Sequence, residues 1–395
     1  MMVVPPPLKH LLCLALCGAF LALGGCASGG VGDMTASVAA SAKSLVGARE
    51  MGEPLMVQMF VASTRRDDTR VGDAVTDGGV RHSLVLASVP PAHRPGAIEL
   101  PTFGKPDLQR HFALTGGRNL TSERFASEIA NHLSGRVGVN RDVLVFVHGF
   151  NTSLDEARFR LAQIVADARF GGVPVLYTWP SQSSVFSYVA AKERATSSRD
   201  GLEALLRDLA ATPGVGRVHV LAHSMGSWLT MEALRENAIG GHPDLDGKLG
   251  EVMLAAPDID ISVFANQMAR LQGRARVSVL VARDDRALNL SSRLAGDRPR
   301  VGALDPSKPG DAAQLAQLGV RVYDVSAFAG GLIGHNAFAD APEVIRGIGA
   351  QLNHPRAGEE PSMAMLKAPD EAEPLPKAAA PADAVASTAS DASAH

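Results

Sequence analysis

The sequence predicts an α/β protein whose mostly parallel sheet is covered by helices on both faces. Through the middle of the chain, short apolar runs alternate with longer segments whose apolar residues recur at helical spacing. One of the runs, 142–147 (DVLVFV), is a continuous stretch of mainly β-branched and aromatic residues after its first aspartate. Such runs are typical of parallel strands buried on both faces. Strands separated by helices are joined by right-handed crossovers into one sheet.

The chain before this region predicts two strands and a helix. Residues 55–63 form a compact apolar run, residues 81–89 alternate between apolar and polar positions, and Gly and Pro punctuate the chain between them. Residues 123–133 carry apolar side chains at helical spacing, and Thr121 and Ser122 before them are good N-capping residues. We therefore expect two strands followed by an amphipathic helix.

The remaining elements alternate in the same way up to residue 325. Strands are expected at 142–147, 174–179, 217–222, 251–256, 276–282 and 320–325. Helices are expected at 154–169, 185–209 (interrupted near Ser197 and Ser198) and 228–237. The Gly- and Pro-rich segment 297–317 is expected to be an excursion of the chain, either a lid near the site or a plain surface loop.

The strand at 217–222 runs directly into residues 222–226 (AHSMG). This order is typical of a nucleophile elbow, a tight turn between strand and helix that presents a serine hydroxyl in a strained backbone conformation. The positions two before and two after Ser224 must be small, because strand and helix pass close to each other there. Here they are Ala222 and Gly226, so alanine replaces the commoner first glycine. Since small-x-Ser-x-small also occurs by chance, the surrounding elements decide the interpretation.

An acid and a histidine follow late strands in the chain order Ser, Asp, His, which is the order expected of an α/β-hydrolase. Asp285 follows the strand at 276–282, and His335 follows the final strand at 320–325. A serine hydroxyl needs a neutral imidazole to take its proton and a carboxylate to hold the tautomer of that imidazole. We therefore assign Ser224 as the nucleophile, His335 as the general base and then acid, and Asp285 as the orienting carboxylate.

The strand at 142–147 ends in the sequence HGFN (148–151). In an acyl-transfer enzyme, a strand end of this kind supplies a backbone N–H group that stabilises the developing oxyanion. We expect the backbone N–H groups of Phe150 and Met225 to form this oxyanion hole. His148 is expected to orient the loop through hydrogen bonds rather than to take part in the chemistry. The alternative is a plain turn from strand to loop.

Six short motifs lie at or near the ends of the expected strands. They are VFVHGFNTS from Val145, YTWPS from Tyr177, LAHSMG from Leu221, LAAPDID from Leu254, DRAL from Asp285 and GHNAF from Gly334. Together they resemble the DUF900 family of α/β-hydrolases, which are esterase- and lipase-like proteins, mostly bacterial. The resemblance covers roughly residues 56–352. It implies an α/β-hydrolase fold and, by position, supports Ser224 and His335.

The carboxylate of the triad has several candidates. By position, the resemblance favours Asp285, which directly precedes Arg286-Ala287-Leu288. Its neighbour Asp284 is an alternative, and so are Asp258 and Asp260, which follow the strand at 251–256. A carboxylate within hydrogen-bonding distance of one ring nitrogen of the histidine is expected to be the acid.

The N-terminus predicts a lipoprotein signal peptide over residues 1–25. Lys9 supplies a short basic region, and the apolar run at 11–23 is shorter than the roughly twenty residues that span a membrane. The run ends in LGGC, which resembles a bacterial lipobox, so Cys26 is expected to be lipidated and to become the first residue of the mature protein. An ordinary secretory signal cleaved nearby is the alternative.

The chain after Cys26 divides into three predicted parts. Residues 26–52 are rich in Ala, Ser and Gly and predict a flexible tether between the lipid and the α/β-hydrolase domain at 53–354. Residues 355–395 form an acidic tail rich in Ala and Pro, which predicts disorder. Ala27 follows the lipidated cysteine, and in bacterial lipoproteins this implies the periplasmic face of the outer membrane of the cell envelope rather than the inner membrane.

Charge and motif content argue against several other classes. The formal net charge is −3, without a Lys/Arg cluster, so no nucleic-acid partner is expected. The sequence has no H-E-x-x-H, no C-x-x-C pair and no phosphate-binding G-x-x-x-x-G-K-S/T loop, so we expect neither a metal nor a cofactor.

These features predict a membrane-anchored serine hydrolase, a carboxylesterase or lipase-like enzyme that cleaves esters through an acyl-enzyme on Ser224. Its expected partners are an ester-containing small molecule or lipid as substrate and a membrane reached through Cys26. Amide or thioester cleavage, action on bilayer lipids, and a non-catalytic envelope protein that keeps the fold for binding are the alternatives. Protein partners are not indicated by the sequence.

Overall fold

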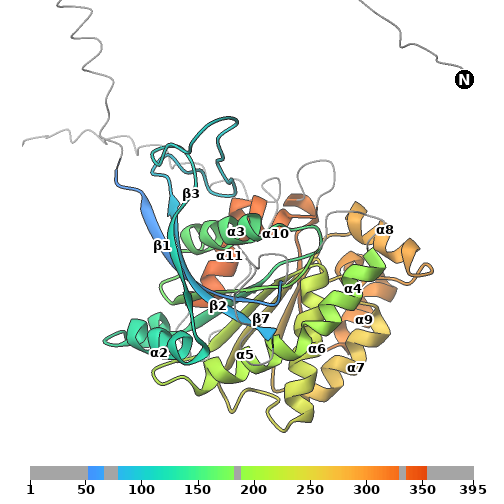
Figure 1. Cartoon of the computed structure of the whole chain (residues 1–395). Helices are drawn as coiled ribbons and strands as arrows, with labels where there is room; N and C mark the ends of the chain where they lie inside the picture. The colour runs from blue at the N-terminus through green and yellow to red at the C-terminus, as the bar shows by residue number, and fades with distance from the viewer. Residues whose placement is uncertain (1–51, 66–78, 182–187, 329–334, 354–395) are drawn as a thin grey trace, which may run out of the picture. The chain divides into compact units, whose positions relative to one another are not determined.

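The computed structural model describes residues 52–65, 79–181, 188–328 and 335–353 (Figure 1). Three predicted parts lie outside these residues: the signal peptide at 1–25, the tether at 26–52 apart from Gly52, and the acidic tail at 355–395. Their assignments therefore stay predictions. No helix among the described residues is both long and apolar enough to cross a membrane.

One sheet organises the described part of the chain. Its nine strands are β1 (Leu55–Ser63), β2 (Arg81–Val89), β3 (Ala113–Leu120), β4 (Val143–Val147), β5 (Val173–Thr178), β6 (Val218–His223), β7 (Leu249–Ala255), β8 (Arg276–Val281) and β9 (Arg321–Asp324). Their order in space is β3-β2-β1-β5-β4-β6-β7-β8-β9. All neighbours from β1 to β9 pair in parallel, and β1, β2 and β3 pair antiparallel at one edge. The predicted mostly parallel sheet is confirmed.

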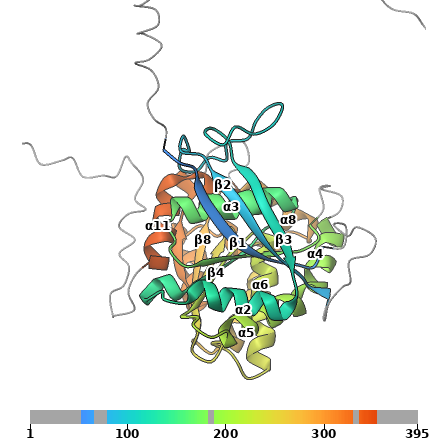
Figure 2. The same ribbon diagram turned by 60° about the vertical axis from the view of Figure 1, so that its left-hand side comes forward.

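Helices cover both faces of this sheet (Figures 1 and 2). They are α2 (Ser122–Leu133), α3 (Leu154–Asp167), α4 (Tyr188–Ser197), α5 (Arg199–Ala211), α6 (Met225–Ile239), α7 (Ile261–Leu271), α8 (Arg286–Leu294), α9 (Pro309–Gln317), α10 (Ala337–Asp340) and α11 (Pro342–Asn353). The 3-10 turns within the described residues are η2 (Gly138–Arg141), η4 (Val301–Ala303) and η5 (Ser326–Phe328).

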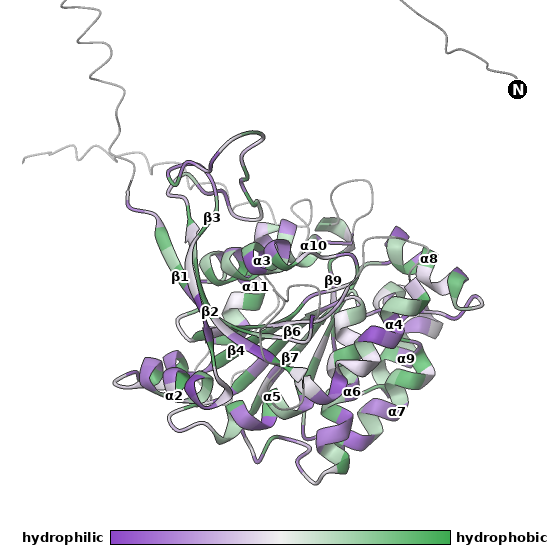
Figure 3. Ribbon diagram, viewed as in Figure 1, coloured by the Kyte–Doolittle hydropathy of each residue, from purple (hydrophilic) through white to green (hydrophobic). Residues whose placement is uncertain are grey.

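The two faces of the sheet make two separate hydrophobic cores. Helices α2, α4, α5, α6 and α7 pack against one face, and α3, α10 and α11 pack against the other. Side chains alternate between faces along a strand, so Val143 and Val145 of β4 join the first core and Leu144 joins the second. Figure 3 shows the central strands as largely hydrophobic. Burial on both sides therefore accounts for the unbroken apolar runs.

Several boundaries agree with the sequence patterns. Strands β1 and β2 begin and end at the predicted residues, and the break between α4 and α5 falls at Ser198. Thr121 caps α2 by accepting the N–H of Arg124, as its position before an apolar periodic run suggested. The predictions for these elements are confirmed.

The elements absent from the sequence-based expectations include strand β3 and the helices α7, α8, α9, α10 and α11. Strand β3 contains Thr115-Gly116-Gly117 and is mostly exposed. Its glycine and polar residues therefore lack the apolar pattern by which a strand is recognised in a sequence. The segment 297–317 is not merely a loop, because it contains η4 and the helix α9. Val301 of this segment is fully buried. Its residues therefore pack into the domain rather than forming a simple surface excursion.

Candidate active site

Ser224 occupies the turn between β6 and α6 with φ 53° and ψ −122°. A non-glycine residue in such a conformation costs about 1 to 3 kcal/mol and persists only where its surroundings enforce it. Here the end of β7 does so. The Ser224 N–H donates to Ala255 O at 2.9 Å, and the Asp258 N–H donates to Ser224 O at 3.2 Å. The sequence 222–226 therefore forms the strained turn expected of a nucleophile elbow.

The glycines around Ser224 allow three backbone segments to meet. A Cβ on Gly226 would lie 2.4 Å from His148 O and 2.7 Å from Val147 O, and a Cβ on Gly149 would lie 3.1 Å from Ser224 Cβ. A small residue is thus required after the serine, but the close neighbour of α6 is the end of the adjacent strand β4. Gly226 therefore faces the end of β4 and not β6, the strand that leads into Ser224.

Asp285 contacts His335 directly. Its Oδ2 accepts the Nδ1 proton of His335 at 2.5 Å, while its Oδ1 accepts the N–H groups of Ala287 and Leu288 and so caps α8. The carboxylate is fully buried, and the His335 side chain is 16 % exposed. With Nδ1 protonated toward Asp285, the other ring nitrogen, Nε2, carries the lone pair that a general base needs.

The other candidate acids have different partners. Asp284 is exposed, whereas Asp258 and Asp260 are buried and engaged elsewhere. Asp284 approaches Arg283 at 3.9 Å. Asp258 contacts Tyr188 Oη at 2.8 Å, Ser291 Oγ at 2.5 Å and Arg300 Nε at 3.2 Å. Asp260 contacts Arg298 Nε at 2.7 Å. Of the four aspartates, only Asp285 bonds to His335 among the described residues.

His335 also lies against His223, the residue before the elbow serine. The Nε2 proton of His223 is donated to His335 O at 3.0 Å, and the two ring centroids are 4.6 Å apart. Burial, followed by the nearby His335, holds the pKa of His223 well below its usual value, so this ring is neutral. No local sequence pattern indicates this contact, because the two residues are 112 positions apart in the chain.

No hydrogen bond joins Ser224 Oγ to His335 among the described residues. Such catalytic contacts are often long in unliganded enzymes and tighten when substrate binds. Contacts through His223 on one side and Asp285 on the other hold His335 at the C-terminal ends of the strands, beside the elbow.

The backbone N–H groups of Phe150 and Met225 donate to no other group within the described chain. By contrast, the N–H groups of Ser224 and Ser227 on either side are bonded. The Phe150 ring packs edge-on against Tyr188, with centroids 6.1 Å apart, and this contact holds the loop after β4. Both expected oxyanion donors are therefore available to a substrate oxygen.

His148 is a buried part of the framework around this loop. Its Nδ1 donates to Gly149 O at 2.9 Å, its Nε2 contacts Thr178 Oγ1 at 2.9 Å, and its ring stacks on Trp179. Burial, and then the positive charge of Arg65, lowers the pKa of His148 to about 3. The neutral, fully bonded ring orients the loop that carries Phe150.

A family comparison agrees with this architecture. A family described as "Alpha/beta hydrolase of unknown function (DUF900)" matches residues 122–356, which is more than half of the chain and includes Ser224, Asp285 and His335. The chain belongs to the DUF900 family. The α/β-hydrolase fold predicted from the strand order is thereby confirmed.

Solved structures with resemblance to this DUF900 protein include three hydrolases. A predicted CIB-like hydrolase from Thermoplasma acidophilum is 13% identical over 75% of this chain and 96% of its own, with a TM-score of 0.35. An esterase from Pyrobaculum calidifontis is 13% identical over 80% and 91%, with a TM-score of 0.37. A Rhizomucor miehei esterase is 12% identical over 80% and 89%, with a TM-score of 0.34. No curated protein sequence matches this one.

The DUF900 protein carries a polar cluster beside the elbow that the sequence did not reveal. Asp258, which bonds to the Ser224 backbone, also accepts the Tyr188 hydroxyl and pairs with the buried Arg300. The cluster ties α4, α8 and the segment before η4 to the end of β7. No group of three or more His, Cys, Asp or Glu side chains in the described ranges has the arrangement to hold a metal ion.

Proposed function

We propose that this DUF900 protein is a serine hydrolase that cleaves carboxylic esters through an acyl-enzyme on Ser224. The observation that carries the proposal is the 2.5 Å contact between Asp285 Oδ2 and His335 Nδ1, beside a serine in the strained elbow conformation. A buried carboxylate on one ring nitrogen fixes the tautomer and stabilises the imidazolium that forms when the other nitrogen takes a proton.

The proposed reaction has two halves. Ser224 Oγ attacks the ester carbonyl carbon while His335 Nε2 takes the hydroxyl proton, and the N–H groups of Phe150 and Met225 stabilise the oxyanion. His335 then gives this proton to the leaving alcohol as the carbon–oxygen bond breaks. In the second half, water attacks the acyl-serine, His335 accepts the water proton, and the same proton returns to Ser224 as the acid leaves.

A fluorophosphonate probe tests this proposal because it reacts with an activated serine and mimics the first half-reaction. We expect one adduct, located on Ser224 by mass spectrometry. Ser227 is an internal control, since its buried hydroxyl already donates to Ala222 O at 3.0 Å. An absent adduct, or an adduct on another residue, would contradict a nucleophilic Ser224 and favour the non-catalytic binding role.

Substrate class follows from a second set of measurements. Hydrolysis rates for short and long p-nitrophenyl esters, a matched anilide and a thioester separate ester cleavage from amide and thioester cleavage. Activity that rises sharply at a lipid interface would identify bilayer lipids as the substrate. Activity confined to soluble short esters would identify a carboxylesterase.

We also propose that a lipid on Cys26 anchors the protein to the bacterial cell envelope, at the outer rather than the inner membrane. The LGGC sequence before and at Cys26 and the following Ala27 support this location. One acyl chain alone binds a membrane weakly, so the multiply acylated terminus of a lipoprotein is needed for stable attachment.

Cys26→Ala is expected to abolish lipid attachment because the thiol that accepts the diacylglyceryl group is gone. The measurement is incorporation of an alkynyl fatty acid and membrane fractionation in a bacterial host. Cys17→Ala, in the apolar run of the predicted signal, is the matched control and should stay lipidated. A Cys26→Ala protein that still incorporates the fatty acid would overturn the proposed anchor.

A further inference from the structure

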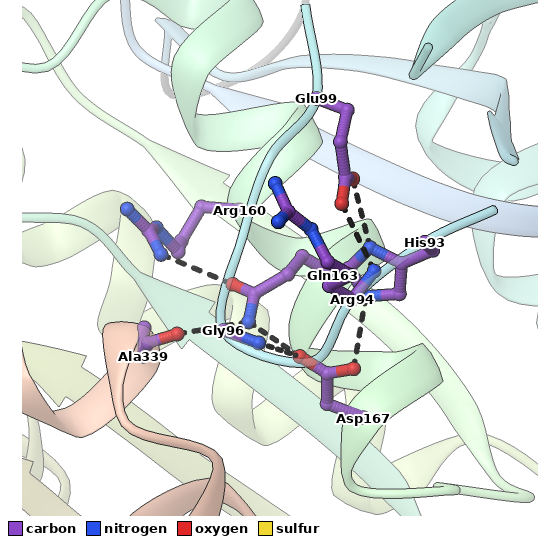
Figure 4. Close-up of polar contacts among 8 residues, drawn as sticks. All are labelled: His93, Arg94, Gly96, Glu99, Arg160, Gln163, Asp167 and Ala339. Carbon is purple, nitrogen blue, oxygen red and sulfur yellow. Dashed lines mark hydrogen bonds and ion pairs between the residues drawn. The ribbon is translucent and has the colours of Figure 1, made fainter. Parts of the chain in front are cut away.

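A buried histidine lies between two carboxylate partners (Figure 4). His93 is in the chain that follows β2, and its Nδ1 lies 2.9 Å from Glu99 Oε2 while its Nε2 lies 2.9 Å from Asp167 Oδ1 at the end of α3. Its side chain is 10 % exposed, and those of Glu99 and Asp167 are 16 % and 3 % exposed. Both ring nitrogens face acceptors, so only the doubly protonated imidazolium satisfies both contacts.

The surrounding charges favour this cation. Burial works against it, but the hydrogen bonds and charges of Asp167 and Glu99 outweigh burial and raise the pKa of His93 above its usual 6.5. The same contacts lower the pKa of both carboxyl groups. The other charged groups around this cluster are Arg94 of the same loop, Arg160 of α3 and, on α10, Asp340, which pairs with Arg160.

The cluster is bonded to helix α10. Gln163 donates one amide N–H to Asp167 Oδ2 at 2.7 Å and the other to Ala339 O of α10 at 2.9 Å. Gly96, whose N–H also donates to Asp167 Oδ2, lies so close to α10 that a Cβ there would be 2.3 Å from Asp340 O. The loop after β2 and the end of α3 therefore hold α10 from one side.

The proposed general base lies directly before helix α10 in the chain. His335 precedes the helix by two residues, and its carbonyl accepts the His223 proton. Phe338 of α10 stacks on His223 with ring centroids 4.6 Å apart and also packs near Phe146 of β4. A displacement of α10 would therefore move the His335 imidazole relative to Asp285 and Ser224.

We propose that His93, held between Glu99 and Asp167, is a positioning residue that fixes α10 and thereby aligns His335 for proton transfer. The inference rests on the proposed function, since it assigns His335 the role of general base. His93 acts through Asp167, Gln163 and α10 and does not touch the reacting atoms.

Protonation of His93 makes this positioning depend on pH. A neutral imidazole has one N–H, so it can bond to only one of its two carboxylate partners. Because the folded-state pKa is raised above 6.5, the cation's contribution to stability is complete below pH 6.5 and is lost as pH rises through the folded-state pKa. We therefore expect α10 to loosen, and kcat to fall, on the alkaline side.

Amide hydrogen exchange of α10, measured by mass spectrometry, tests the contact without requiring any hydrolysis. In His93→Gln, exchange over residues 337–340 should rise roughly tenfold at pH 6, where wild type carries the cation. His242→Gln is the matched control, because His242 makes an exposed 2.9 Å pair with Asp246 that is remote from α10. Unchanged α10 exchange in His93→Gln would overturn the proposed contact, whether or not the protein proves to be an esterase.

The kinetic test uses ester hydrolysis over a range of pH. A misplaced base lowers kcat by up to about 100-fold, so His93→Gln should lose kcat with KM changed less than about twofold. The kcat of His93→Gln should also lack the decline at alkaline pH that wild type shows. His242→Gln should keep both the wild-type kcat and its alkaline decline. Equal losses in the two variants, or a loss confined to KM, would contradict a positioning role.

Glu99→Gln supplies a second variant if His93→Gln does not fold. Its amide oxygen still accepts an N–H of His93, but the charge that favours the cation is gone. The alkaline decline of kcat, and the onset of α10 exchange, should therefore move to lower pH. An unshifted decline would overturn the role of His93. A wild-type protein that neither hydrolyses esters nor reacts with the fluorophosphonate refutes the proposed function instead, and the exchange measurement still decides the contact.

Discussion

Replacing Ser224 with alanine is expected to lower kcat for ester hydrolysis by about 10⁶-fold, the loss typical of removing the nucleophile of a serine hydrolase. The oxyanion donors and the substrate contacts remain, so KM should change little. Steady-state kinetics on a p-nitrophenyl ester give the effect. The variant should also fail to react with the fluorophosphonate probe.

The control for this substitution is Ser127→Ala on α2, where the serine donates only to Arg124 O and is exposed. It should retain wild-type kinetics. Alanine at position 224 keeps the unfavourable φ of 53°, so the melting temperature should stay close to that of wild type. A Ser224→Ala variant with more than about 1 % of wild-type kcat would exclude Ser224 as the nucleophile, since the expected residual is far smaller.

Asp285→Asn is expected to lower kcat by about 10⁴-fold, because an amide does not hold the Nδ1–H tautomer of His335 or stabilise its imidazolium. Asparagine is as good an N-cap as aspartate, so helix α8 should persist. The substitution thus separates the electrostatic role from the structural one. The pH dependence of kcat measures the electrostatic role, and a thermal melt followed by circular dichroism measures the structural role.

Asp284→Asn is the matched control for this experiment. Asp284 is the adjacent residue, is exposed, and approaches Arg283 only at 3.9 Å, so its loss should change kcat by less than about twofold. Asp258→Asn provides the comparison with the other buried candidate, whose partners are Tyr188 and Arg300. A larger loss in either variant than in Asp285→Asn would reassign the acid.

The parts of the fold that the sequence predicted are those with strong local patterns. Strands β4 to β8 are largely apolar runs that end at turn residues, and α2 and α5 have one apolar face, so the sequence pattern located them. Strand β3 was missed because Gly116 and Gly117 are poor strand formers and pairing with β2 supplies the stability. Helix α9 was missed because the Gly and Pro residues within 297–317 favoured a loop over a helix.

The active-site candidates show the same limit. Local sequence identified Ser224, since an elbow is a contiguous motif, and it offered four carboxylates because several strands end in acidic residues. Only the tertiary structure, which brings together segments far apart in the sequence, shows that Asp285 and not Asp258 contacts His335. The His223–His335 contact and the His93 cluster join residues far apart in sequence, so no local signal marks them. The roles assigned to these residues stay predictions.

The backbone of Ser224 is bonded on both sides to the end of β7, through Ala255 and Asp258. These residues follow the whole of α6 in the chain, so a nascent chain that ends before them lacks the neighbour that enforces the serine conformation. The strained conformation of Ser224 therefore forms only once β7 has assembled beside β6. For a chain with a predicted signal peptide, this order means that the proposed nucleophile reaches its strained conformation only when the domain is complete.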